Sequence, residues 1–150
     1  MSNSAFGVEK PEDSPGLLLW QTTITWQRLI KTALAKDDIS HPQFVILAIV
    51  LWFTEQGQQP TQIKIIELSK LDKMTVSQSL KKLTQRGFTL RQEHDTDTRA
   101  KMVRLTPKGK TLTARLVKKV EKIDASFFGK LNLKDYNSLL KILGSLLLNQ

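Results

Sequence analysis

Two consecutive stretches decide the fold: TQIKIIELSKLDKMTVSQSLKKLTQRGF at residues 61–88 and TLRQEHDTDTRAKMVRL at residues 89–105. The first stretch predicts two short helices that meet at a tight turn. The second predicts a β-hairpin with a charged tip. A helix pair followed by a basic hairpin is an arrangement that places one helix in a DNA groove and a loop beside it. We therefore expect the rest of the chain to support this unit.

The first helix of the pair is predicted over Gln62–Lys70. Thr61 precedes it and carries a side-chain oxygen of the kind that caps helix N-termini. We expect its core contacts to come from three apolar residues, Ile63, Ile66 and Leu68. Leu71–Asp72 then makes the turn to the second helix.

The second helix is predicted over Lys73–Arg86, with Asp72 as its N-cap. Val76, Leu80 and Leu83 recur at i, i+4 and i+7, so they are expected to face the core. The opposite face then presents an outward stripe of Met74, Gln78, Lys81 and Gln85.

This outward face has the chemistry of a DNA-reading helix, which needs hydrogen-bonding side chains outside and cations at its margins. Gln78 suits a bidentate contact to adenine, and Met74 suits a thymine methyl group. The alternative is an ordinary amphipathic helix with a solvated polar face. The predicted DNA-binding residues of the helix are Lys73, Met74, Thr75, Ser77, Gln78, Lys81 and Lys82.

The hairpin is predicted from strands at Phe88–Glu93 and Met102–Leu105, joined by the charged tip HDTDTRAK. Carboxylates repel phosphate, so we interpret Asp97 as a support that holds Arg99 extended. An arginine held in this way suits a narrow minor groove. Arg99 and Lys101 are therefore added to the predicted DNA-binding residues. The alternative is a solvated turn with incidental charges.

Four further predicted helices surround this unit. The helix after residue 131 is so rich in leucine that we expect it to pair with a second subunit. We interpret residues 1–16 as a flexible arm and residues 17–150 as one domain. Within that domain, residues 17–42 and 107–150 hold dimerisation helices, and residues 43–106 form the DNA-binding part. The helices are predicted at residues 17–35, 43–56, 107–129 and 132–150.

The charge distribution agrees with a polyanionic partner. The 150 residues have a formal net charge of +9. Residues 61–119 carry 15 basic and 5 acidic side chains, whereas residues 1–60 carry 4 and 6. Positive charge confined to the segment with the motif favours nucleic acid over a general solvated surface. There is no cysteine, which excludes disulfides and thiolate metal sites. With no signal peptide or membrane span evident, we expect a cytoplasmic protein.

At this point the sequence resembles the winged helix-turn-helix of the MarR (multiple antibiotic resistance regulator) family of transcription factors. The resemblance rests on ELSKLDKMTVSQSLKKLTQRGF followed by DTDTRAKMVRLTPKG. The wing pattern of the family is matched at Asp97, Arg99, Val103, Leu105, Thr106 and Gly109. The fold class expected is mainly α (α+β), a winged helix-turn-helix with a two-stranded wing and flanking dimerisation helices.

The resemblance implies an obligate dimer on a pseudo-palindromic operator. It also implies regulation relieved by a small aromatic or anionic ligand. The recognition-helix role is carried to Thr75, Ser77, Gln78 and Lys81, and the wing role to Arg99. Our function prediction is a transcriptional regulator, most simply a repressor, that binds double-stranded DNA as a homodimer. The alternative is a winged-helix architectural or interaction protein with no operator.

Other chemistry has little support in the sequence. His41 and His94 are far apart and show no metal-ligand spacing, so no metal or cofactor is expected. No catalytic spacing is present, so we do not expect an enzyme. Aromatic residues at helical spacing are often plain core, but they also suit the lining of an effector pocket between the dimer helices and the DNA-binding part. The candidates for that pocket are Trp20, Trp26, Phe44 and Trp52.

Overall fold

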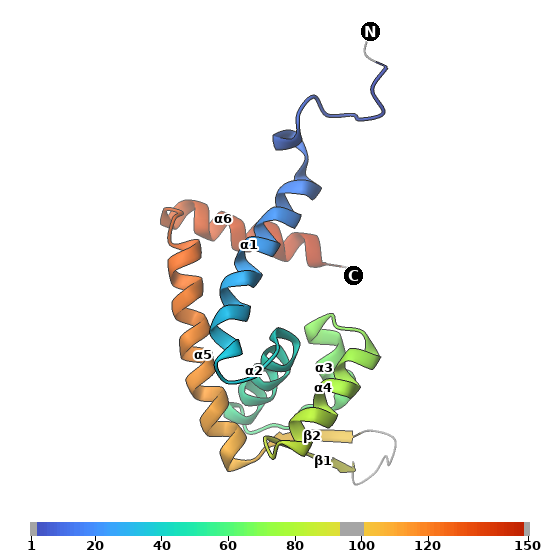
Figure 1. Cartoon of the computed structure of the whole chain (residues 1–150), viewed down its shortest axis with the longest axis vertical. Coiled ribbons are helices and arrows are strands. Elements are labelled where there is room, and N and C mark those ends of the chain that lie inside the picture. Colours follow the sequence, from blue (N-terminus) through green and yellow to red (C-terminus); the bar gives the residue numbers. More distant parts are fainter. Residues whose placement is uncertain (1–2, 94–100, 149–150) are drawn as a thin grey trace.

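The computed structural model describes residues 3–93 and 101–148. Within these ranges it contains a short 3-10 helix, six α-helices and one antiparallel pair of strands (Figure 1). This order confirms the predicted mainly α winged helix-turn-helix. The elements are η1 (Pro11–Asp13), α1 (Pro15–Ala35), α2 (His41–Glu55), α3 (Gln62–Ser69), α4 (Lys73–Gln85), β1 (Thr89–Glu93), β2 (Lys101–Leu105), α5 (Pro107–Phe128) and α6 (Leu133–Leu147).

Two helices begin earlier than the sequence analysis placed them. The Ser40 Oγ accepts a bond from the Gln43 N–H at 3.2 Å, and the Gln43 side chain accepts from the Ser40 N–H at 2.9 Å. This capping box starts α2 at His41, so His41 and Pro42 are helical rather than part of a connection. In the same way, Ser14 caps α1 and leaves Pro15 as its first residue.

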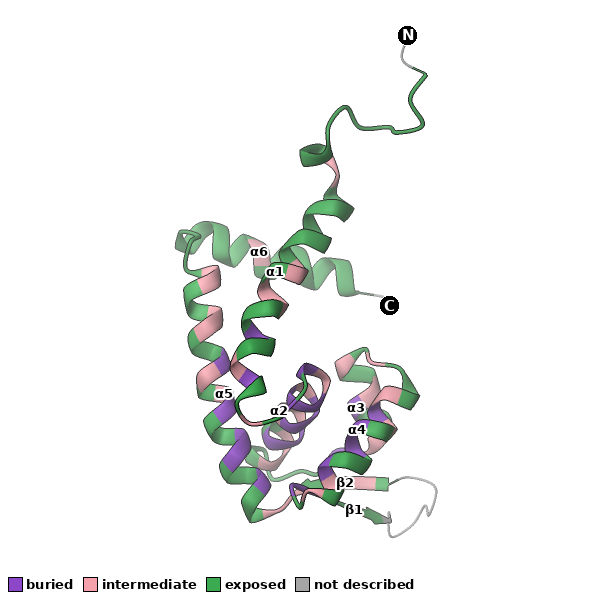
Figure 2. Cartoon of the chain, viewed as in Figure 1, coloured by how far each residue is buried: buried purple, intermediate pink, exposed green. Residues whose placement is uncertain are grey.

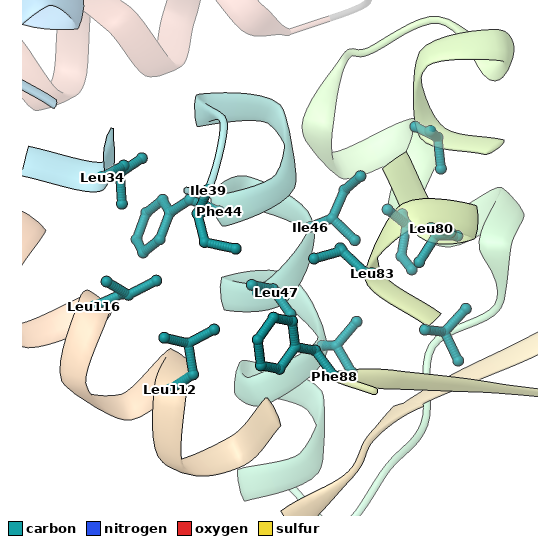
Figure 3. Close-up of a cluster of buried hydrophobic side chains, with 14 of the residues drawn as sticks. Leu34, Ile39, Phe44, Ile46, Leu47, Leu80, Leu83, Phe88, Leu112 and Leu116 are labelled. Carbon is teal, nitrogen blue, oxygen red and sulfur yellow. The ribbon is translucent and has the colours of Figure 1, made fainter. Parts of the chain in front are cut away.

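The core is organised around α2, which packs against α1, α3, α4, α5 and β2. Figure 3 shows Ile46 and Leu47 of α2 between side chains from α4 on one side and α5 on the other. The three inward residues predicted for α4 are all fully buried, which confirms its orientation; they are Val76, Leu80 and Leu83.

The prediction for the inner face of α3 was wrong for two of its three residues, whereas Ile66 packs against the core. Ile65 is its only buried residue, and Ile66 is half-buried. Ile63 and Leu68, which we expected in the core, are 61% and 50% exposed. A helix of eight residues has too few turns to define an apolar stripe, so the tertiary contacts with α2 and β2 decide which side faces inward.

The parts of the chain far from α4 are barely buried. Figure 2 shows that the N-terminal half of α1 and nearly all of α6 are exposed. No residue of α6 is buried, although the helix is strongly apolar on one side. The exposed apolar residues of these two helices are Leu17, Leu18, Leu19, Trp20, Leu29, Leu133, Leu140, Ile142, Leu143, Leu146 and Leu147. None of the helices described is long and apolar enough to cross a membrane.

Candidate nucleic-acid interface

The outward face of α4 is available for contact with a partner. Gln78, Lys81 and Lys82 are exposed, and Met74 is 69% exposed. Lys73, at the first position of α4, is exposed as well. The predicted stripe therefore lies on the surface, next to the β1–β2 hairpin in Figure 1.

The N-terminus of α4 is held by its cap. Asp72 accepts a bond from the Thr75 N–H at 2.7 Å and another from the Thr75 hydroxyl at 2.8 Å. These bonds to Thr75 lower the pKa of Asp72 below its ordinary value. Thr75 and Ser77 are half-buried, so these two predicted contact residues present less of their side chains than Gln78 does.

The C-terminus of α4 is tied to the connection between α1 and α2. The Arg86 guanidinium donates to the backbone carbonyls of Asp37 and Asp38. The Asp37 carboxylate in turn accepts two bonds from Arg115 of α5, at 2.6 and 3.2 Å. The bond from Arg115 is the main reason that the pKa of Asp37 lies below its ordinary value.

The hairpin beside α4 (Figure 1) carries further cations. Lys101 and Arg104 of β2 are exposed. Arg91 of β1 is half-buried and donates a hydrogen bond from Nη2 to the Ser77 carbonyl of α4 at 3.1 Å. Neither Arg91 nor Arg86 is among the residues predicted to contact DNA. Residues 94–100 lie outside the described residues, so the predictions for Asp97 and Arg99 stay predictions.

The four aromatic residues predicted for an effector pocket lie in different surroundings. Trp20 and Trp52 are 67% and 57% exposed, and Phe44 belongs to the buried core. Trp26 is half-buried, and its indole N–H donates to Asp124 of α5 at 2.8 Å. None of the four lines the cavity of about 650 Å³ between the end of α5 and α6. Their proposed role as the lining of an effector pocket stays a prediction.

The side chains described hold no group of three or more histidine, aspartate or glutamate residues placed to bind a metal ion. His41 lies at the start of α2 with its ring edge against Trp26, at a centroid distance of 5.2 Å. The arrangement near α4 thus offers hydrogen-bond donors and cations on a rigid helix beside a basic hairpin. That chemistry suits a nucleic acid.

The architecture is similar to that of solved regulators. The Bordetella bronchiseptica protein BpsR, whose DNA binding is regulated by 6-hydroxynicotinic acid, superposes with a TM-score of 0.83 and 23% identity, over 96% of this chain and 100% of BpsR. A mutant MarR of Escherichia coli in complex with operator DNA gives a TM-score of 0.76 and 20% identity, over 88% of this chain and 92% of the other.

The sequence places the chain in a family. The winged-helix domain described as ArnR1-like matches residues 35–124. YdcH of Bacillus subtilis, named as an HTH-type transcriptional regulator, is 38% identical over 118 residues, which are 79% of this chain and 80% of YdcH. The chain belongs to the MarR family. This MarR-family protein is a transcriptional regulator with a DNA-binding winged helix, which confirms the predicted resemblance and the general function.

Proposed function

We propose that the protein is a repressor that binds a pseudo-palindromic operator in the cytoplasm as a homodimer and is released by a small aromatic or anionic ligand. The observation that carries the proposal is the exposed stripe of α4, Met74, Gln78 and Lys81, beside a basic hairpin. In this arrangement α4 enters the major groove and the hairpin lies along the neighbouring minor groove.

Affinity and sequence choice come from different residues. Lys73, Lys81, Lys82 and Lys101 supply charge for phosphates, which makes binding depend strongly on salt. Thr75, Ser77, Gln78 and Met74 lie near base edges, and Arg99 serves the minor groove. Gln78→Ala is expected to remove about 1–3 kcal/mol of discrimination at one base pair of each half-site.

The test for Gln78 is a titration of operator variants that differ at single base pairs. Gln58→Ala, in the exposed turn after α2, is the matched control because it removes the same side chain away from α4. If Gln78→Ala kept the base preferences of the parent at every position, α4 would not read the operator through this residue.

A homodimer explains the uncovered helices. The apolar residues exposed on α1 and α6 would cost about 25 cal/mol per Å² of contact with water, and a second copy would cover them. A cavity of about 650 Å³ lies between α5 and α6, and Phe128, Leu139 and Leu143 are among the residues that line it. The partner's helices would fill this cavity.

Light scattering tests the dimer directly. The parent is expected to be dimeric at micromolar concentration, and Leu143→Glu is expected to shift it toward monomer. A parent that stays monomeric at this concentration would contradict the proposed assembly and, with it, the paired half-sites.

Release by a ligand is supported by BpsR, whose DNA binding is regulated by 6-hydroxynicotinic acid. A panel of aromatic acids added to the operator complex is expected to contain a compound that dissociates it. The competing possibility is a protein that binds DNA without an operator. The observation that supports it is the net charge of +9, which attracts DNA of any sequence. Equal competition by random DNA and by the DNA upstream of its own gene would establish that possibility instead.

A further inference from the structure

Arg91 connects the hairpin to the middle of the recognition helix. Its Nη2 donates to the backbone carbonyl of Ser77 at 3.1 Å. A carbonyl inside a helix cannot rotate independently, so this bond holds the helix itself rather than a mobile side chain. The bond lies further along β1 than the contact between the Thr84 and Thr89 hydroxyls, which are 2.9 Å apart at the base of the hairpin.

At the level of Arg91, strand β2 is already anchored to the segment before α3. Val103, the partner of Arg91 in the strand register, is fully buried, and its N–H donates to the Pro60 carbonyl at 2.9 Å. Arg91 therefore adds a second point of attachment between the hairpin and α4. Two separated points fix the angle between two elements, whereas one point leaves them free to tilt.

Holding the side chain in this position has an energetic cost. The Arg91 Nε is buried and has no hydrogen-bond partner among the residues that the structure describes, and an unsatisfied buried donor is unfavourable. A hollow of about 400 Å³ lies beside it, and none of the described residues that line it carries a carboxylate; they are Ser77, Lys81, Thr84, Gln85, Leu90 and Arg91. Lys81 brings a second positive charge to the same hollow. Among the described residues, the bond to the Ser77 carbonyl of α4 is what holds this side chain.

We propose that Arg91 is a positioning residue that sets the angle between α4 and the hairpin, so that both engage one operator at the same time. The inference rests on the proposed function, in which α4 lies in the major groove and the hairpin in the minor groove. The rival role is a direct contact from Arg91 to a DNA phosphate, made together with Lys81. The two roles differ in whether charge or geometry is essential.

Arg91→Lys separates them, because lysine keeps the charge but lacks the planar fork of donors. Loss of a charged hydrogen bond of this kind is expected to weaken operator binding about tenfold. For a positioning residue, the loss is confined to operator DNA, and affinity for random DNA is unchanged. Arg28→Lys, at an exposed position of α1, is the matched control and is expected to bind operator like the parent.

Three results would overturn the inference. Arg91→Lys could bind operator like the parent, or weaken operator and random DNA equally. In the third contrary result, Arg91→Gln lowers the slope of log Kd against log salt by about 0.9 per bound protomer, whereas Arg91→Lys leaves it unchanged. That pattern would indicate a direct contact from Arg91 to a phosphate.

Chemical footprinting distinguishes a lost hairpin contact from a general folding defect. At a temperature where thermal unfolding shows both Arg91→Lys and the parent folded, the variant is expected to keep major-groove protection and lose protection in the flanking minor groove. Equal loss of both contradicts the positioning role. If the parent itself shows no preference for operator DNA, the proposed function fails; if the parent has the preference and Arg91→Lys keeps it, only the role of Arg91 fails.

Discussion

Replacement of Gly109 by alanine tests how α5 is joined to the DNA-binding part. Gly109 lies in the first turn of α5, and a Cβ added there would stand 2.0 Å from the Phe88 carbonyl oxygen, whereas ordinary contact begins at 3.4 Å. The obstacle is backbone, so no side chain can rotate away. The start of α5 must shift by more than an ångström from Phe88, which lies just before β1.

The shift would disturb the bonds that join the two segments. The Thr106 N–H donates to the Phe88 carbonyl at 3.0 Å, and the Thr106 hydroxyl donates to the Gly87 carbonyl at 2.6 Å. Overpacking of this kind typically costs about 1–3 kcal/mol. Alanine regains up to about 1 kcal/mol through its helix propensity. We therefore expect the free energy of unfolding to fall by about 1–2 kcal/mol, which lowers the Tm by about 2–8 °C.

Thermal and urea unfolding followed by circular dichroism measure this effect. Gly16→Ala is the matched control, because Gly16 also lies in the first turn of a helix but has no atom within 4 Å of an added Cβ. The control is expected to be neutral or slightly stabilising. A Gly109→Ala variant as stable as Gly16→Ala would refute the close approach of α5 to Phe88.

Two further substitutions test the junction of α1, α2 and α5. Burial lowers the pKa of His41 from its ordinary 6.5, Lys31 lowers it further and Asp124 opposes them. The unfolded chain therefore takes up this proton first, and the free energy of unfolding should decrease as the pH falls below about 6.5. His41→Phe should remove that part of the pH dependence, as measured by urea midpoints from pH 7.5 to 5.5. Trp26→Phe leaves the Asp124 acceptor without its indole donor and should lower the free energy of unfolding by about 1–2 kcal/mol in the same assay. Trp52→Phe is the control, and because Trp52 is exposed we expect it to be close to neutral.

The sequence was most informative where local signals agreed with each other. For α4, the Asp72 cap and the spacing of Val76, Leu80 and Leu83 point to the same helix and the same buried face, and the structure confirms both. The start of α2 was missed although Ser40 and Gln43 have the spacing of a capping box. The predicted helix began at residue 43, after Pro42, whereas proline is well tolerated in a first helical turn.

Residues that act through tertiary bonds were beyond the reach of sequence patterns. Arg91 bonds to a backbone carbonyl 14 residues away, and Arg86 to carbonyls 48 and 49 residues away. Backbone acceptors have no identity in the sequence, so no pairing of charges reveals such bonds. Arg86 and Arg91 looked like additional surface cations of a basic segment. Only the packing of α4 against the hairpin and against the α1–α2 connection distinguishes them.

The connection between α1 and α2 is the place where the two functional parts of the molecule meet. Lys119 of α5 donates to the Ala33 carbonyl at the end of α1, at 2.9 Å, and Arg115 of α5 holds Asp37. Arg86, at the end of α4, donates to the carbonyls of the same connection. The orientation of α4 is therefore set against α1 and α5, the helices that continue toward the uncovered apolar surface. In a dimer formed through that surface, this chain of bonds would transmit the spacing of the two subunits to the spacing of the two recognition helices. A change at the dimer surface would then alter operator binding without touching a residue that contacts DNA.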